Sequence, residues 1–376
     1  MRTLTIISIL IWTFCIQAQI NDFNTEKFQI AEKGVIVLSM DGSPEGGELA
    51  VSTRMGKLIF YTAEGYNKLR EFNLAGFTNG ARVRYSPDGK YVIMKKIRLA
   101  DWNVNKDNKQ RVMIIDATTG KKVADHDGVY DLTISPDGNT YAIMDKGHLK
   151  IKSLQGGKTI SEVKDERLQS SITFGPEGKM IYASRGFDKS DLKKDPRFKK
   201  NKKGAKAFSK YQQTIVGYDV QNGTEQFISP ESMDEIYDIQ CSKRGDCILV
   251  YAKQDTRVNA VATTNFILQM DLSNGMLMRE QFNSRLPDPD YKENLKQNII
   301  GVTTTEDMDA SQSVMLYDRG TNEIIARFDI DARFLEGIFQ GQFMDGTASF
   351  DFSADGRYLL VGIGNFFYRW KIKRED

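Results

Sequence analysis

Short apolar runs alternate with tight polar turns along most of this chain. In each unit an apolar run leads into a Ser-Pro-Asp-Gly type turn, a second apolar run follows, and a third ends in Asp and a Gly-containing turn. The first turn is clearest at residues 86–89, 135–138, 175–178 and 353–356. Proline presets φ at the second turn position and glycine takes a positive φ, so each turn predicts a hairpin of antiparallel strands. Repeats of roughly 40 residues built from short strands indicate a radial array of small sheets.

The pattern predicts an all-β fold, a seven-bladed β-propeller with four-stranded antiparallel blades. The predicted units span residues 35–61, 82–120, 129–153, 171–223, 236–275, 299–318 and 349–372. The sixth unit has a plain third strand, but its first strand is not recognisable. The seventh lacks an outermost strand, and residues 26–30 can supply it. We therefore predict that the segment around Phe28 pairs beside Trp370 and closes the ring.

The turn geometry also predicts a register. The residue just before the turn should face the residue two places after the glycine, as Tyr85 would face Tyr91. In the fifth unit this register places Cys241 opposite Cys247, with Cα atoms about 4.5 Å apart, which is within reach of a disulfide. Oxidising conditions outside the cytoplasm would favour the bond. The alternative is a pair of reduced, buried thiols.

The first eighteen residues have the features of a signal peptide. Arg2 precedes an apolar stretch over residues 4–15, and Ala18 offers a small residue for cleavage. Residues 19–376 would then form a single propeller domain, exported to the periplasm or outside the cell. A retained membrane anchor is one alternative. A lipoprotein anchored at Cys15 is another, although the residues before that cysteine are not the small ones such cleavage requires.

Charge is unevenly distributed. The whole chain carries +2, but residues 185–213, an insertion in the fourth unit, hold eleven Lys or Arg and three Asp, a net charge of +8. The rest of the chain is therefore acidic, at −6. Long segments between second and third strands are expected at residues 95–110, 185–213, 253–265 and 303–311, and long connections between units at 283–297 and 331–347. In a propeller these all open on one face, which makes that face the candidate recognition surface.

Basic and aromatic residues in these segments are the candidate partner-binding residues. They are Lys95, Lys96, Arg98, Trp102, Lys199, Lys200, Lys202, Lys203 and Tyr211. They suit another exported or outer-membrane protein, or an anionic glycan. Nucleic acid is not expected as a partner of an exported chain with an acidic remainder. The alternative is a solvated insertion whose charge serves solubility alone.

The chain resembles the WD40-like family of β-propellers, most closely over residues 126–138. There His126, an apolar strand and a Ser-Pro-Asp-Gly turn follow one another in the family's order. The Trp-Asp ending of the family is represented only by Trp370 and Lys371, which is closer to the degenerate repeats of exported bacterial propellers. The resemblance implies a structural role for His126, whose side chain would reach an Asp such as Asp145 in the turn between second and third strands.

The residues favour a non-catalytic binding or scaffolding protein. The only histidines are His126 and His148, so the other units offer none for a metal or acid-base site. The spacing of Asp307 and Asp309 fits no calcium-loop signature. Neither a phosphate-binding glycine loop nor a nucleophile elbow is present, and no cofactor or metal is expected. The alternative is a propeller enzyme, similar to a lactonase or hydrolase, with its site in the central funnel.

Overall fold

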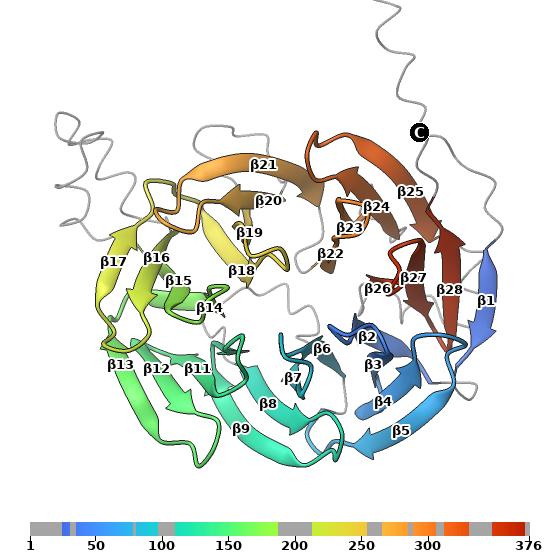
Figure 1. The fold of residues 1–376 in the computed structure, drawn as a ribbon, viewed down its shortest axis with the longest axis horizontal. Helices are drawn as coiled ribbons and strands as arrows, with labels where there is room; N and C mark the ends of the chain where they lie inside the picture. Colours follow the sequence, from blue (N-terminus) through green and yellow to red (C-terminus); the bar gives the residue numbers. More distant parts are fainter. Residues whose placement is uncertain are drawn as a thin grey trace, which may run out of the picture.

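The computed structural model is a ring of seven β-sheets around a central axis (Figure 1). It describes residues 25–30, 35–77, 80–96, 110–186, 213–253, 265–284, 289–305, 312–330 and 348–372. Each sheet has four antiparallel strands, and every strand in the described ranges belongs to one of them. The predicted all-β, seven-bladed propeller is confirmed. Within those ranges no helix has the length and apolar character needed to cross a membrane.

The blades follow chain order around the ring, and the strands of each run from the innermost to the outermost. Blade 1 comprises β2 (Val37–Gly42), β3 (Glu48–Thr53), β4 (Lys57–Thr62) and β5 (Lys68–Asn73). Blade 2 comprises β6 (Ala81–Tyr85), β7 (Tyr91–Lys96), β8 (Gln110–Asp116) and β9 (Lys122–Val129). Blade 3 comprises β10 (Asp131–Ile134), β11 (Thr140–Asp145), β12 (His148–Ser153) and β13 (Thr159–Lys164). Blade 4 comprises β14 (Leu168–Phe174), β15 (Met180–Gly186), β16 (Gln213–Asp219) and β17 (Glu225–Ile228).

The remaining three blades complete the ring. Blade 5 comprises β18 (Glu235–Cys241), β19 (Ile248–Lys253), β20 (Asn265–Met270) and β21 (Leu277–Ser284). Blade 6 comprises β22 (Tyr291–Asn294), β23 (Ile299–Thr305), β24 (Gln312–Asp318) and β25 (Ile324–Ile330). Blade 7 comprises β26 (Ser349–Phe352), β27 (Tyr358–Ile363), β28 (Phe366–Lys371) and β1 (Glu26–Gln29).

The last blade joins the two ends of the described chain, as predicted. Phe28 of β1 lies opposite Phe367 of β28, and Glu26 lies opposite Arg369. The Phe28 ring also meets the edge of Tyr66 from blade 1, with centroids 4.8 Å apart. β1 therefore covers the outer edge of β28 and contributes to the seam with the first blade.

The hydrophobic core lies between the blades. Phe60 of blade 1 packs in one buried cluster with Val83 and Met94 of blade 2. Met40 of blade 1 packs in another with Phe367 of blade 7, on the other side of the same sheet. Each sheet thus buries apolar side chains against its neighbours, and no blade has a complete core of its own.

The serine of the repeated turn has a defined bonding role. The Ser86 carbonyl accepts the Gly89 N–H at 2.9 Å, which leaves the Tyr91 N–H without that acceptor. The Ser86 hydroxyl oxygen accepts the Tyr91 N–H at 3.0 Å and donates to Asp88 at 2.6 Å. The same pair of bonds recurs at Ser135 and at Ser353. Serine and aspartate recur in the turn because together they satisfy its backbone.

The glycine of the turn allows close approach between blades as well as a positive φ. A Cβ atom on Gly46 would lie 2.5 Å from the Cβ of Ala354 in the blade 7 turn. One on Gly245 would lie 3.0 Å from Pro176 in the blade 4 turn. Turns of neighbouring blades therefore pack against each other around one face of the ring.

The predicted hairpin register is wrong by one residue. Tyr85 pairs with Val92, because Tyr91 already lies opposite the first turn residue and is bonded to it. In blade 5, Cys241 accordingly pairs with Ile248, while the Ser242 N–H bonds to the Cys247 carbonyl at 3.0 Å. Successive strand residues face opposite sides of a sheet, so the two thiols lie on opposite faces. The predicted disulfide is wrong, and both cysteines are free. Burial raises the pKa of each thiol to about 12, which keeps both neutral.

The first strand of blade 6, which the sequence pattern did not predict, is β22. It lies inside residues 283–297, where the pattern predicts a long connection between blades. All of its residues are buried although Lys292, Glu293 and Asn294 are polar. A strand buried with polar side chains has no apolar alternation to reveal it.

Length between second and third strands varies widely. The connection is short in blade 1 (residues 54–56) and in blade 3 (residues 146–147). It is longer in blades 2, 4, 5 and 6, where it comprises residues 97–109, 187–212, 254–264 and 306–311 respectively. In antiparallel blades these connections all leave from the same face, opposite the repeated turns. The predicted signal peptide, and the insertion except for its ends at Arg185, Gly186 and Gln213, lie outside the described residues.

Candidate functional site at the centre of the ring

Each innermost strand carries a polar side chain at its penultimate residue and another two positions earlier. The pairs are Ser39 and Asp41, Arg82 and Arg84, Asp131 and Thr133, Ser171 and Thr173, Asp238 and Gln240, Tyr291 and Glu293, and Ser349 and Asp351. An innermost strand has one edge that faces the axis without a partner strand, so its N–H groups need other acceptors. These side chains lie where they can supply them.

In four seams the side chains of one blade accept N–H groups of the next. From blade 1 to blade 2, Ser39 accepts from Val83 at 3.1 Å and Asp41 from Tyr85 at 2.6 Å. The other bonds are Ser349 with Met40 at 2.9 Å, Asp351 with Gly42 at 2.6 Å, Asp131 with Ile172 at 2.9 Å, Ser171 with Ile239 at 3.0 Å and Thr173 with Cys241 at 3.1 Å. Seven of the fourteen polar side chains in these pairs therefore hold neighbouring blades together.

Blades 2, 5 and 6 depart from this rule, and their departures meet. Arginine has no acceptor, so Arg84 cannot bond to the backbone of blade 3 in this way. Its guanidinium instead donates to Asp238 of blade 5 at 3.2 Å, which takes the side chain across the ring. The Tyr291 hydroxyl of blade 6 and the Gln240 amide donate to the same carboxylate, each at 2.9 Å. Asp238 is therefore the meeting point of blades 2, 5 and 6.

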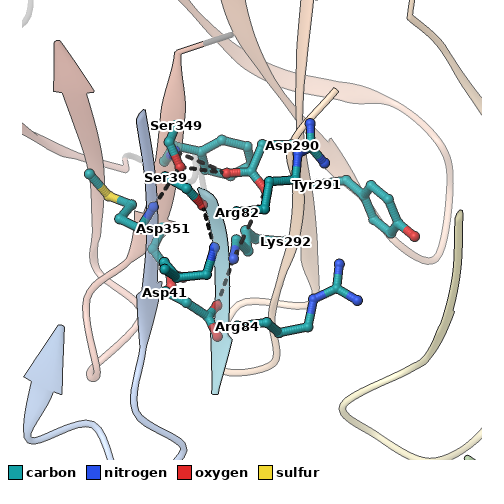
Figure 2. A network of polar contacts seen from close by, with 12 residues as sticks. Ser39, Asp41, Arg82, Arg84, Asp290, Tyr291, Lys292, Ser349 and Asp351 are labelled. Carbon is teal, nitrogen blue, oxygen red and sulfur yellow. Dashed lines mark hydrogen bonds and ion pairs between the residues drawn. The ribbon is translucent and has the colours of Figure 1, made fainter. Parts of the chain in front are cut away.

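A second cluster joins blades 6, 7 and 1 (Figure 2). The Lys292 ammonium lies 2.6 Å from an Asp41 oxygen and 3.9 Å from Asp290. The other Asp290 oxygen accepts a hydrogen bond from the Ser349 hydroxyl at 2.8 Å. The Lys292 and Asp41 side chains are only 9% and 8% exposed, so this ion pair is almost dry. The ammonium occupies the place among these carboxylates that a bound cation could take.

The pKa values of the central carboxyl groups shift in opposite directions. Burial alone would raise the pKa of Asp41, but Lys292, Lys243 and the Tyr85 N–H together outweigh burial and lower that pKa. Burial raises the pKa of Asp351, and the lysines nearby offset this only in part. Burial likewise opposes ionisation of Asp238, but Arg84 and Lys95 hold its pKa well below the usual range. The environment thus favours the ionised form of Asp41 and Asp238 and makes ionisation of Asp351 less favourable.

The raised pKa of Asp351 predicts a pH-dependent effect of Asp351→Asn. A group whose pKa is raised on folding contributes stability below its ordinary pKa of 3.8, and this is lost as the pH rises through the folded value. Relative to the wild type, the variant should therefore gain stability as the pH rises from 4 to 7. Urea unfolding of both proteins across this range measures the difference. The amide loses one acceptor for the Phe352 N–H, but that constant cost leaves the slope unchanged. A difference that is flat with pH contradicts the prediction.

Comparison with known proteins adds no name to this site. No protein-family model matches the chain, and no curated protein matches it either. The role of the central clusters is therefore inferred from their own geometry and charge. Among the residues that the structure describes, no group of three or more His, Cys, Asp or Glu could hold a metal ion.

Of the candidate partner-binding residues, the structure describes only two. Lys95 forms an ion pair with Asp131 of blade 3 and is 18% exposed, so it belongs to the inner wall of the ring. Lys96 ends β7 with its side chain exposed. The others, Arg98, Trp102, Lys199, Lys200, Lys202, Lys203 and Tyr211, lie outside the described residues, as do Asp307 and Asp309.

His126 and Asp145 have different partners from those expected. The His126 ring lies 3.4 Å from the Tyr141 hydroxyl, and burial lowers its pKa. The Asp145 carboxylate accepts the N–H of its own neighbour, Lys146, at 2.6 Å. His126 also lies in β9, the outermost strand of blade 2, where it pairs with Val112. The structure thus gives His126 a structural contact, but to a tyrosine and without Asp145.

The central residues Arg84, Asp238, Tyr291 and Lys292 were not among the sequence candidates. One signal could have found them, because in most innermost strands the polar pair is Ser, Thr or Asp. Two arginines in blade 2 break that series. The partner of Arg84 in blade 5, Asp238, is 154 residues away, a pairing that no local pattern reveals.

Proposed function

We propose that this chain is an exported, non-catalytic propeller of the WD40-like type that binds or scaffolds a partner through the face bearing its long connections. The partner would be another exported or outer-membrane protein, or an anionic glycan. The observation that carries this proposal is that the long connections, those between second and third strands and the connection of residues 331–348 between blades 6 and 7, all leave from one face.

The bonding of the centre supports a binding role over catalysis. Ser39, Asp41, Ser171 and Ser349 all accept backbone N–H groups of the next blade. A side chain that holds a neighbouring strand is not available to move a proton to and from a substrate. The inner wall therefore acts mainly as a rigid frame, and the loops on one face provide the variable surface.

Charge in the longest connection supports an anionic partner. Residues 187–212 belong to the segment that carries +8 in a chain whose remainder is acidic. A concentrated positive field speeds encounter with negatively charged partners and discriminates against others. Lys199, Lys200, Lys202 and Lys203 are the residues to change first.

Charge reversal on the two faces tests the proposal. We expect a variant with Lys199, Lys200, Lys202 and Lys203 changed to Glu to lose most of the partner recovered by crosslinking and affinity capture from the native cell. The matched control reverses four exposed lysines of the opposite face, Lys90, Lys121, Lys158 and Lys179. Equal recovery by both variants would sink the proposal. Intact-mass analysis of the exported protein tests the expected start at Gln19.

A propeller enzyme with its site in the funnel is the second candidate. The observation in its favour is that the pKa of Asp41 is lowered while that of Asp351 is raised. In enzymes, two carboxyl groups whose pKa values are pushed apart can serve as base and acid. This candidate would be supported if the protein hydrolysed an ester or lactone and if Asp351→Asn abolished that activity while the partner still bound.

A further inference from the structure

The exposed charge inside the ring is positive, although the centre contains many carboxylates. Asp131, Asp351 and Glu293 are 2% to 4% exposed, because they are turned toward neighbouring blades. Asp238 and Asp290 are each 17% exposed. The Arg84 side chain is 37% exposed even though it crosses the middle of the ring. Arg84 therefore presents more of its charged side chain to the space at the centre than any of these carboxylates does.

The bonding of Arg84 leaves most of its hydrogen-bonding capacity available. A guanidinium has five N–H donors in a planar fork that suits a carboxylate in bidentate fashion. Within the described residues Arg84 makes a single bond, from one Nη to one Asp238 oxygen at 3.2 Å. That oxygen also accepts bonds from Tyr291 and Gln240, so it is shared among three donors. The contact with Asp238 is thus a long, single bond that a better-placed carboxylate can replace.

Two further cations, Arg82 of the same strand and Lys95 of β7, lie between Arg84 and the face with the long connections. Arg82 lies directly opposite Lys95 in the β6–β7 pair, and like charges in that position destabilise a sheet. Arg82 also donates to the Pro289 carbonyl at 3.2 Å, which brings it toward blade 6. The connection of residues 97–109 leaves from this end of β7, so the cations lie toward the face proposed for recognition.

We propose that Arg84 binds a carboxylate of the partner, which enters the channel from the face with the long connections, with Arg82 and Lys95 adding attraction. The carboxylate takes the fork of Arg84 and competes with Asp238 for it. The inference rests on the proposed function and specifies the chemistry of the partner as an acidic segment. A free dicarboxylate would present the same group, and the experiment separates the two sources.

Calorimetric titration of the full chain with hexaglutamate and, separately, with succinate tests the site. Asp238→Asn removes the competing carboxylate and should tighten binding of the acidic probe by about tenfold. Arg84→Lys keeps the positive charge but removes the planar guanidinium, and should weaken binding of the acidic probe by about tenfold. The double change Arg84→Gln with Asp238→Asn removes the guanidinium without leaving a buried carboxylate unpaired, and should abolish binding. Arg357→Gln, in an exposed turn of blade 7 on the opposite face, is the matched control and should bind as the wild type does.

Several outcomes would overturn the proposal. It fails if the double variant binds as well as the wild type, or if neither the wild type nor Asp238→Asn binds a probe. If the protein binds succinate but not hexaglutamate, the carboxylate does not come from an acidic segment of a partner, and the site is assigned to a small dicarboxylate. The variant with four lysines of the insertion changed to Glu (Lys199, Lys200, Lys202 and Lys203) should bind the probes as the wild type does. The probe titration therefore tests the Arg84 site alone, whereas capture of the partner with that variant tests the proposed function.

Discussion

Lys292→Met should lower the free energy of unfolding by about 3–5 kcal/mol, because it breaks a buried ion pair by removing one partner. The ammonium is 2.6 Å from Asp41, and although burial opposes its charge, Asp41, Asp290 and Asp351 leave the pKa of Lys292 raised. In the variant, Asp41 would lose the ammonium that offsets its burial in a nearly dry seam between blades. Urea unfolding at pH 7, analysed for midpoint and slope, measures the loss.

Two further variants make this result specific. Adding Asp41→Asn to Lys292→Met removes the stranded charge and should recover part of the lost stability, while Lys179→Met, at a lysine that is 80% exposed, should have almost no effect. A loss below about 1 kcal/mol in the single variant would mean that water reaches Asp41 and that the ion pair is not structural.

Removing the closing strand should be comparably damaging. A chain that starts after residue 30 loses the pairing of β1 with β28, the Phe28 contact with Tyr66 and the bond from the Tyr61 hydroxyl to the Ile30 carbonyl at 2.9 Å. We expect a loss of at least about 3 kcal/mol from the strand pairing, the contact of the partly buried Phe28 and the Tyr61 hydrogen bond together. The uncovered edge of β28 should also associate with other chains. Urea unfolding and light scattering measure the two effects. A chain that starts at Thr25 is the control, and equal stability and a monomeric state for both chains would contradict the prediction.

The repeated turn was enough to predict the architecture, because its chemistry is local. Ser86, Asp88 and Gly89 satisfy one another within a few residues, so the hairpin they form is visible in the sequence. The same turn misled on register, since the serine hydroxyl replaces a backbone acceptor and moves the pairing by one residue. The disulfide expected between Cys241 and Cys247 depended on that register and failed with it.

The central site depends on contacts that are distant in sequence. β22 was missed because Lys292 and Glu293 are polar, and they are buried only because Asp41 and Arg319 pair with them. The Lys292 contact joins different blades and spans 251 residues. No turn signal or apolar alternation marks such a residue. A break in the series of small polar residues on the innermost strands is the sign that the sequence does contain.

The position of β1 sets an order on folding. Synthesis begins at the N-terminus, but the first described strand pairs only with β28, with Glu26 lying opposite Arg369. Blades 1 to 6 can each form from consecutive strands, whereas blade 7 must wait until the chain is complete. Closing so large a loop carries an entropic cost that is recovered only when the last contacts form. Until then the unclosed ring exposes the faces of blades 1 and 6, and the protein depends on rapid completion or on protection from other chains.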